Sequence, residues 1–396
     1  MMRVLHISSE FPPQQVFGLG RYVAELAKEQ VRLGHEVHVL TNSMGGQDQD
    51  VIDSGVAIHR INYPPPPKPT GPVSPVLAFN LFLQDRSLEL GKASMGDPNL
   101  IVTHDWLTAL AGAHISKRFA IPHIWTVHDT VHGKRFGRLE RHDVAVFAIE
   151  RWAMKTADAV IANSKSIKGE LTQVYQGDEQ KIHVVPCAID PRWYEEIQEN
   201  SRLEKYRELF ASPDELLITY VGRLDLEKGI DTLINAFAKT KKQCPKIRLA
   251  IIGKGELENV IREHITSLAL TESVSLYGYL DGEALKHLFL ISDIHVCPSL
   301  YEPFGIVALE AMAARRPVIA SAVGGLCDII DSPDVGRLVP PANVDELSAT
   351  MLALIGNPDL RCDLGKKAAQ RAKNTFNWTN VAHACNNVYS ELGLRK

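Results

Sequence analysis

Two glutamates, eight positions apart, lie in the segment PSLYEPFGIVALEAM at 298–312. Glu302 lies just before an expected helix, and Glu310 lies inside it as the only polar side chain of the stretch 306–314. A carboxylate on so apolar a helix is costly unless a partner hydrogen-bonds it. Ligand hydroxyls such as those of a ribose would satisfy Glu310, and so would an ion pair with a cation of the chain.

The expected helix opens near Phe304, and the backbone N–H groups of Phe304, Gly305 and Ile306 lie at its start. Unpaired N–H groups at a helix N-terminus bind phosphate and hydroxyl oxygens. Together with Glu302 they predict a site that binds the hydroxyls and phosphate of a ligand. The alternative is that Glu302 is an acid of the first turn, stabilised only by the helix dipole.

A second pattern places two cations after the expected strand 216–221. The strand runs into Gly222, and Arg223 and Lys228 then flank a turn that Gly229 closes before a helix. Arg binds phosphate as a bidentate fork and Lys as a point charge, so this pair suits a diphosphate. Cations in loops are otherwise solvated, and the pair gains weight from the glutamates at 302 and 310.

The first expected strand, 3–8, leads to Gly18, Leu19 and Gly20 ahead of a helix. This is not the G-x-G-x-x-G pattern of dinucleotide-binding loops, although its backbone amides are suited to face a phosphate.

Two later strands, 100–103 and 123–127, end in the same pair of residues. His104-Asp105 follows one and His128-Asp129 the other. Because ligands of parallel sheets bind at the carboxyl ends of strands, the pairs are expected near the site. They predict ligand or catalytic contacts, with structural hydrogen bonding and metal binding as the alternatives.

Two segments lie outside these motifs. The run YPPPPKPTGPVSP at 63–75 predicts a stiff surface loop, with a partner-binding motif as the alternative. The basic segment 132–142 predicts a solvated helix face, with contact to an anionic acceptor or a lipid surface as the alternative.

Short apolar β-rich runs alternate with longer helical patterns along the whole chain, which indicates βαβ units and parallel sheets. Further strands are expected at 36–41, 57–61, 158–162, 182–186, 248–252, 274–277, 294–297, 317–320 and 336–339. The charged segment 190–214 separates two series of strands. The sequence therefore predicts an α/β protein of two doubly wound, Rossmann-like domains with a ligand cleft between them, at 1–195 and 196–377.

Composition excludes several classes of protein. The 396 residues carry 43 Lys+Arg and 47 Asp+Glu, a formal net charge of −4 without the basic field that nucleic-acid binding requires. The six cysteines form no C-x-x-C pair, which favours a reducing cytoplasm over a disulfide framework or a zinc cluster. We expect no signal peptide and no transmembrane segment.

Three motifs together resemble the retaining GT-B glycosyltransferases of the large family that contains sucrose-phosphate synthases and phosphatidylinositol mannosyltransferases. They are Gly222-Arg223 with Lys228-Gly229, the IIGKGE turn at 251–256 and EPFGIVALE at 302–310. The HDW at 104–106 resembles bacterial glycogen synthases. The Lys-x-Gly-Gly-Leu loop that those glucan synthases usually carry is absent, because residues 15–19 read Gln-Val-Phe-Gly-Leu. The resemblance implies two Rossmann-like domains, the second for the nucleotide sugar and the first for the acceptor, and a last helix within 378–396 that returns to the first domain.

The resemblance also implies a role for each residue. Arg223 and Lys228 would hold the diphosphate, Glu310 the ribose, and Glu302 with Phe304, Gly305 and Ile306 the hydroxyls of the donor sugar. Gly253 belongs to the same binding surface, Gly18, Leu19 and Gly20 would approach the diphosphate, Asp105 would bind the acceptor, and His128 would lie beside the anomeric carbon.

The expected function is transfer of a hexose, glucose first, from UDP- or ADP-glucose to a hydroxyl of a small acceptor, with retention at the anomeric carbon and no metal or other cofactor. Elongation of a glucan such as glycogen or starch is the alternative within the family. Outside it stand a nucleotide-sugar epimerase and a non-catalytic sugar-nucleotide-binding protein. The sequence leaves open the base and sugar of the donor, the acceptor, the oligomeric state and any peripheral membrane contact.

Overall fold

The computed structural model of the chain describes residues 1–13, 18–43, 46–63, 71, 73–93, 95–190, 192–195 and 201–394. The chain divides into two compact units. One consists of Met1–Cys187 together with Trp378–Lys396, and the other of Ala188–Asn377. The last helix, α16 (Trp378–Glu391), therefore belongs to the unit that contains the first strand.

The first unit contains an eight-stranded sheet with the order β3-β4-β2-β1-β5-β6-β7-β8. Its strands are β1 (Arg3–Ile7), β2 (Glu36–Asn42), β3 (Gln49–Asp53), β4 (Val56–Ile61), β5 (Leu100–His104), β6 (His123–Val127), β7 (Ala159–Ala162) and β8 (Ile182–Val184). All neighbouring strands are parallel except β3 and β4.

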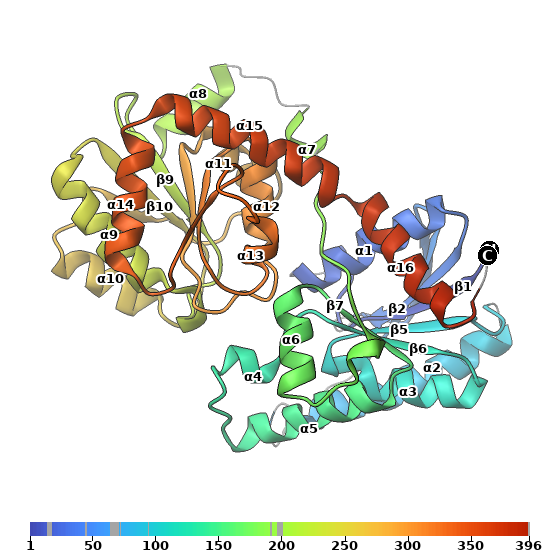
Figure 1. Cartoon of the computed structure of the whole chain (residues 1–396). Coiled ribbons are helices and arrows are strands. Elements are labelled where there is room, and N and C mark those ends of the chain that lie inside the picture. The colour runs from blue at the N-terminus through green and yellow to red at the C-terminus, as the bar shows by residue number, and fades with distance from the viewer. Residues whose placement is uncertain are drawn as a thin grey trace. The chain divides into compact units, whose positions relative to one another are not determined.

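Helices cover both faces of this sheet (Figure 1). They are α1 (Gly18–Arg32), α2 (Val73–Ala93), α3 (Trp106–Phe119), α4 (Val131–Lys134), α5 (Arg141–Thr156), α6 (Lys165–Gln173) and α16. Helices α2, α3 and α5 pack side by side on one face, and α1 packs against α16 on the other. Helix α1 buries the stripe that includes Val23, Leu26 and Gln30, and Gly34, with φ 85°, takes the left-handed conformation after its end.

The second unit contains a six-stranded, wholly parallel sheet with the order β11-β10-β9-β12-β13-β14. Its strands are β9 (Leu216–Val221), β10 (Ile247–Ile252), β11 (Val274–Leu276), β12 (Ile294–Cys297), β13 (Val318–Ser321) and β14 (Arg337–Val339). Its helices are α7 (Arg192–Glu195), α8 (Ser201–Glu208), α9 (Ile230–Gln243), α10 (Glu258–Ser267), α11 (Gly282–Ile291), α12 (Ile306–Ala313), α13 (Leu326–Ile329), α14 (Val344–Ile355) and α15 (Pro358–Thr375).

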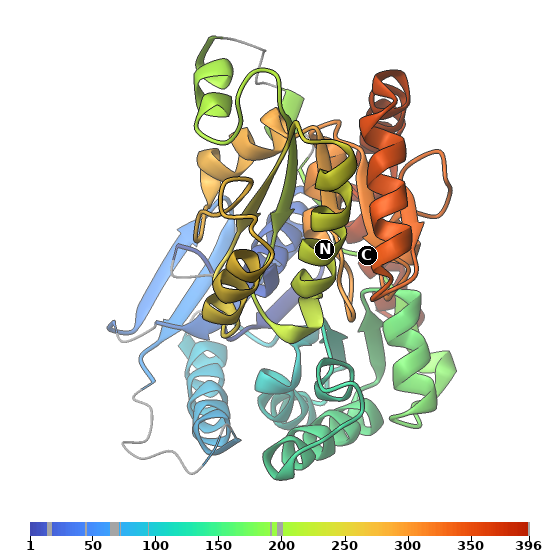
Figure 2. The ribbon, with the colours of Figure 1, turned by 90° about the vertical axis from the view of Figure 1, so that its left-hand side faces the viewer.

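Both faces of this second sheet are buried because side chains alternate along each strand. Ile218 and Tyr220 of β9 pack into a core with α9 and α14, which lie beside each other (Figure 2). Leu217, which precedes Ile218 and faces the other side of the sheet, packs into a separate core with α8 and α11. The continuous apolar run LLITYV therefore reflects a strand that is covered on both sides.

In each unit the order of the strands reverses once. From β1 the chain builds outward through β2 and β4, and then returns to place β5 on the other side of β1. The second unit repeats the pattern, with β10 on one side of β9 and β12 on the other. This is the doubly wound α/β arrangement that the sequence predicted.

The strands predicted from the sequence are present with ends shifted by at most two residues. Strand β3 was not predicted, since its five residues are exposed and it pairs antiparallel at the edge of the sheet. The helix expected to open near Phe304 begins at Ile306. Residues 64–70 and 72 of the proline-rich run lie outside the described residues. Among the described helices, none is long and apolar enough to cross a membrane.

Two helical glycines of the first unit test how tightly it is packed. A Cβ at Gly112 of α3 would lie 2.1 Å from Thr103 Cγ2 and 2.7 Å from His123 Nε2, whereas a Cβ at Gly169 of α6 would meet no atom within 4 Å. Gly112→Ala should lower the free energy of unfolding by about 1–3 kcal/mol through overpacking. Gly169→Ala should raise it by about 0.5–1 kcal/mol through helix propensity. Denaturant unfolding measures both, and equal effects would contradict this packing.

Candidate functional site

The point where the strand order reverses in the second unit lies between β9 and β12. The motif with Arg223 and Lys228 follows β9, and the motif with Glu302 and Glu310 follows β12. Ligands of open α/β sheets bind outside the carboxyl ends of the strands at this point. The two loops are joined, because the backbone N–H of Leu300 donates to the carbonyl oxygen of Glu227 at 2.8 Å. The structure therefore brings the two motifs, which are far apart in sequence, into one site.

Lys228 and Glu302 contact each other directly across this site. Lys228 Nζ lies 2.8 Å from Glu302 Oε2, and the Ser299 hydroxyl donates to the same oxygen at 3.1 Å. Both charged side chains are largely buried, with 16% and 18% of their surface exposed. Lys228 ends a 3₁₀ turn, Leu226–Lys228, that Gly229 closes with φ 63°.

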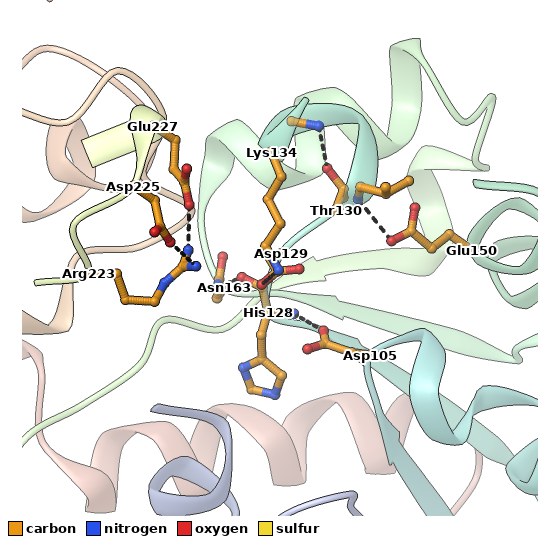
Figure 3. A network of polar contacts seen from close by, with 12 residues as sticks. Asp105, His128, Asp129, Thr130, Lys134, Glu150, Asn163, Arg223, Asp225 and Glu227 are labelled. Atoms are coloured by element: carbon orange, nitrogen blue, oxygen red, sulfur yellow. Dashed lines mark hydrogen bonds and ion pairs between the residues drawn. The ribbon is translucent and has the colours of Figure 1, made fainter. Parts of the chain in front are cut away.

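Arg223 also has acidic partners within its own loop (Figure 3). Its guanidinium forms ion pairs with Asp225 and Glu227 and remains half exposed. The carbonyl oxygen of Arg223 accepts a hydrogen bond from the Tyr220 hydroxyl at 2.7 Å, which fixes the backbone after β9. The backbone of Arg223 is thus fixed, while part of its guanidinium remains exposed to solvent.

Glycines allow the loops at this end of the sheet to approach closely. Gly253 has φ 144°, and a Cβ there would lie 1.8 Å from the carbonyl oxygen of Gly222. A Cβ at Gly229 would lie 2.1 Å from the carbonyl oxygen of Pro298. Both contacts are with backbone, so neither position accommodates a side chain without a shift of a loop.

The residues from Phe304 to Ile306 form the start of α12. Gly305 is its N-cap residue with φ 110°, Ile306 is its first residue, and Phe304 is buried. Glu310 is 5% exposed, and it takes part in an interaction within the chain. A partner within the chain was the alternative to a ligand in the sequence analysis, so a ligand is not required to satisfy the Glu310 carboxylate.

In the first unit the order of the strands reverses between β1 and β5, and His104-Asp105 follows β5. Asp105 has φ 56°, and its Oδ1 accepts a hydrogen bond from the backbone N–H of His128 at 2.7 Å (Figure 3). Its burial, with the nearby charge of Asp129, raises the pKa of the Asp105 carboxyl well above its usual range. Asp105 therefore fixes the backbone at the end of β6.

His128 is half-buried, and protein contacts hold its ring. Its Nε2 lies 3.1 Å from His104 Nδ1, and its ring packs edge-on against Tyr22 with centroids 4.7 Å apart. Its carbonyl oxygen accepts a hydrogen bond from Asn163 Nδ2 at 2.7 Å. Burial lowers the pKa of His128 to about 4.

Behind His128 lies a row of buried polar side chains that the sequence analysis missed. His104 Nε2 lies 3.1 Å from His6 Nδ1, and His6 Nε2 lies 2.8 Å from Gln30 Oε1. Gln30 Nε2 in turn donates to the Tyr389 hydroxyl at 2.8 Å. The available signal was polarity at core positions: His6 interrupts an apolar strand, and Gln30 lies in the buried stripe of α1.

The remaining expected residues of the first unit are also placed. Gly18, Leu19 and Gly20 form the first turn of α1, while residues 14–17 lie outside the described residues. Asp129 forms an ion pair with Lys134 at 2.7 Å (Figure 3). The two His-Asp pairs thus contact other groups of the protein, and their four side chains do not point to one common centre.

The basic segment 132–142 is partly neutralised within the chain. Besides the pair between Lys134 and Asp129, Arg135 lies 3.2 Å from Asp143 at the start of α5. The segment is therefore less basic than its sequence indicates.

Both parts of the chain match known glycosyltransferase families. Residues 16–193 match the family described as "Glycosyltransferase Family 4", and residues 201–371 match "Glycosyl transferases group 1". A glycosyltransferase of Methanocaldococcus jannaschii is 31% identical over 392 residues, 98% of both chains. A glycogen synthase of Mycobacterium tuberculosis is 30% identical over 405 residues, 98% of this chain and 94% of the relative. The structure of sucrose-phosphate synthase from Thermosynechococcus elongatus superimposes with a TM-score of 0.84 at 26% identity, over 99% of both chains.

A buried carboxyl near the first-unit site generates a pH prediction. Glu150 accepts hydrogen bonds from the Val131 N–H at 3.0 Å and the Tyr175 hydroxyl at 2.6 Å, yet burial raises its pKa from 4.5 to about 8. Between these values the folded chain keeps a proton that the unfolded chain releases. Stability from this group is therefore complete below pH 4.5 and is lost as the pH rises through 8.

Glu150→Gln should therefore gain in stability relative to the original protein as the pH rises from 5 to 8, by up to about 1.4 kcal/mol per pH unit. Denaturant unfolding across this range measures the difference. The exposed Glu179→Gln is the control and should follow the original protein. A difference that does not change with pH would contradict the assignment of a raised pKa to Glu150.

Proposed function

Because the chain belongs to the family 4 glycosyltransferases and has their GT-B fold, we propose that it transfers a hexose, glucose first, from UDP- or ADP-glucose to a hydroxyl group of a small acceptor, with retention at the anomeric carbon. The observation that carries the proposal is the contact of Lys228 with Glu302, beside Arg223, at the reversal of strand order in the second unit.

In this proposal Arg223 and Lys228 bind the diphosphate of the donor. Both cations are held by acids before a ligand arrives, Arg223 by Asp225 and Glu227 and Lys228 by Glu302. Arrival of a diphosphate replaces part of these contacts with charge-assisted hydrogen bonds to phosphate oxygens. The same cations then stabilise the negative charge that grows on the leaving phosphate, which lowers the barrier.

The sugar and ribose of the donor are assigned to the β12–α12 segment. When Lys228 binds the diphosphate, Glu302 is free to accept hydrogen bonds from sugar hydroxyls. It does so beside the backbone N–H groups of Phe304, Gly305 and Ile306. Glu310 is assigned to the ribose hydroxyls, for which it would have to exchange its present interaction within the chain. Gly253 keeps the neighbouring β10 loop close to Gly222 and leaves room for the nucleotide.

The first unit is assigned to the sugar and the acceptor. His128 is proposed to contact the donor sugar near its anomeric carbon, Asp105 to hold the segment that meets the acceptor, and the N-terminal turn of α1 at Gly18, Leu19 and Gly20 to approach the phosphate. For the retaining step we propose a front-side displacement, in which the leaving phosphate oxygen takes the proton of the acceptor hydroxyl as the new bond forms.

Elongation of a glucan is the second candidate, and a specific observation favours it: the relative that is 30% identical over almost the whole chain is a glycogen synthase. The small-acceptor proposal is supported by the sequence of residues 15–19, which lacks the Lys-x-Gly-Gly-Leu pattern, and by the fold likeness to a sucrose-phosphate synthase. An epimerase or a non-catalytic binding protein would retain the donor residues and give no transfer.

We also propose that the reaction needs no metal, because the side chains of Arg223 and Lys228 supply the positive charge at the diphosphate. A cytoplasmic location is proposed on the six cysteines, all of which are free thiols. The ion pairs of Lys134 and Arg135 leave only part of the 132–142 segment for an anionic acceptor or membrane surface.

Replacement of the cations tests the donor site. Arg223→Ala and Lys228→Ala should each lower kcat/KM by about 100-fold, with the loss mainly in kcat, because each contact strengthens as the phosphate leaves. Arg262→Ala and Lys239→Ala are matched controls, since these cations pair with Glu258 and Asp345 outside the site. Steady-state kinetics in which both site variants remain within threefold of the original protein would remove these residues from the mechanism.

The function as a whole is tested by an array of nucleotide sugars against acceptors, read as release of nucleotide diphosphate and repeated with EDTA. We expect turnover with UDP- or ADP-glucose and small hydroxyl compounds, an α-linkage by NMR, and no loss with the chelator. Length-dependent transfer to glycogen or maltooligosaccharides would select the glucan alternative. Conversion of the donor alone would indicate an epimerase, and an inverted linkage would contradict the retaining mechanism.

A further inference from the structure

Five side chains from separate elements form one continuous hydrogen-bonded row inside the first unit. Tyr389 of α16 contacts Gln30 of α1, Gln30 contacts His6 of β1, His6 contacts His104 of β5, and His104 contacts His128 after β6, with distances from 2.8 to 3.1 Å. The first four side chains are buried, and only His128 reaches the surface. The row therefore connects the returning C-terminal helix to the residue proposed at the donor sugar.

The amide of Gln30 gives the row a direction, because its nitrogen only donates and its oxygen only accepts. Its Nε2 donates to the Tyr389 oxygen, and the Tyr389 hydroxyl has the sulfur of Cys385 as a second partner for its own proton. Gln30 Oε1 therefore requires an N–H at His6 Nε2. The direction of the row therefore follows from this orientation of the amide, with Nε2 toward Tyr389 and Oε1 toward His6.

From His6 onward each neutral imidazole passes the same requirement to the next. A neutral ring has one N–H and one accepting nitrogen. With Nε2 protonated, His6 accepts at Nδ1, so His104 must donate from Nε2. His104 then accepts at Nδ1, so His128 must also donate from Nε2. The three rings share one tautomer.

The rings remain neutral at ordinary pH, which the row requires because a charged imidazolium donates from both nitrogens. Burial lowers the pKa of His6 and of His128 to about 4, although the carboxylate of Asp129 acts in the opposite direction on His128. Burial and the two neighbouring histidines hold the pKa of His104 well below its usual range. Tyr22 packs on His128 and His104 from α1 by its ring edge.

We propose that Tyr389, Gln30, His6 and His104 are positioning residues that hold His128 in its Nε2–H tautomer, so that its Nδ1 lone pair accepts a hydrogen bond from a hydroxyl of the bound hexose. His128 Nδ1 has no hydrogen-bond partner among the residues that the structure describes. The inference rests on the proposed function for the identity of the ligand, whereas the tautomer follows from the protein alone.

The fixed tautomer sets the direction of the hydrogen bond to the sugar. A hydroxyl both donates and accepts, and an accepting nitrogen requires it to donate, whereas a deoxy sugar leaves this polar atom unpaired. The opposite tautomer would present an N–H, and the same hydroxyl would have to accept instead. The buried row therefore selects one orientation of the hydroxyl.

The tautomer is measured directly by long-range ¹⁵N–¹H correlation NMR of the ¹⁵N-histidine-labelled full chain at pH 7, with His128 assigned from the spectrum of His128→Gln. We expect His6, His104 and His128 to be neutral, each with an unprotonated Nδ1 and a protonated Nε2. A His128 ring that is protonated at Nδ1, charged, or averaged between tautomers would overturn the proposal, whether or not any transfer activity is found.

Two distant variants test control through the row. Gln30→Met removes the amide at nearly constant volume, and Tyr389→Phe removes only the hydroxyl that orients it. Both should give a tautomer mixture at His128, and Gln30→Met should raise the KM for the nucleotide sugar about tenfold with little change in kcat. The control is His59→Gln, which breaks another stacked pair, between His38 and His59 of the same sheet.

The control variant should keep the His128 signals and the KM of the original protein. Failure of the proposed function, seen as absence of transfer with every donor, leaves the tautomer measurement intact and separable. An unchanged His128 spectrum in Gln30→Met would overturn the positioning role even if KM rises, because the loss would then be a general effect of destabilisation. An equal change of the His128 signals in His59→Gln would also overturn the positioning role.

Discussion

The reversal of strand order is the constraint on which the site depends. Where successive strands build outward from β9 in both directions, the loops that follow β9 and β12 leave toward opposite faces of the sheet, so neither covers the other. Backbone amides, cations and carboxylates at these two strand ends remain accessible while the sheet beneath them is rigid. The same reversal at β1 and β5 in the first unit exposes the ends of the strands that lead to Asp105 and to the N-terminal turn of α1.

Charge balance at the second-unit site is arranged within the chain. Three acids, Asp225, Glu227 and Glu302, hold Arg223 and Lys228 before any ligand is present. A half-exposed guanidinium gives up such a pair at small cost, since exposed ion pairs contribute little. The more deeply placed Lys228 pair is harder to replace, so the two cations differ in how readily they turn to an anionic ligand.

The sequence predicted most of the fold, because doubly covered strands such as β9 and β12 are continuous apolar runs and the helices between them have clear stripes. It did not predict β3, whose residues are all exposed and whose pairing depends only on the hairpin with β4. It selected Arg223, Lys228 and Glu302 as candidates by type and spacing. It did not predict that Lys228 and Glu302 contact each other, because such a pairing across 74 positions depends on the adjacency of two strands. His6 and Gln30 were missed because a single polar residue in an apolar run has no spacing pattern of its own.

The position of α16 affects the order in which the protein can be completed during synthesis. The first unit is interrupted in sequence, since Ala188–Asn377 is inserted between its sheet and its last helix. A nascent chain can therefore form β1 to β8 early, but the face of α1 that packs on α16 stays open to water until the whole second unit has been translated. Chaperone contacts and proteolytic sensitivity of the nascent chain are thus expected to concentrate on this face. A chain that ends before Trp378 would keep α1 on the sheet but leave its α16-facing side exposed to water.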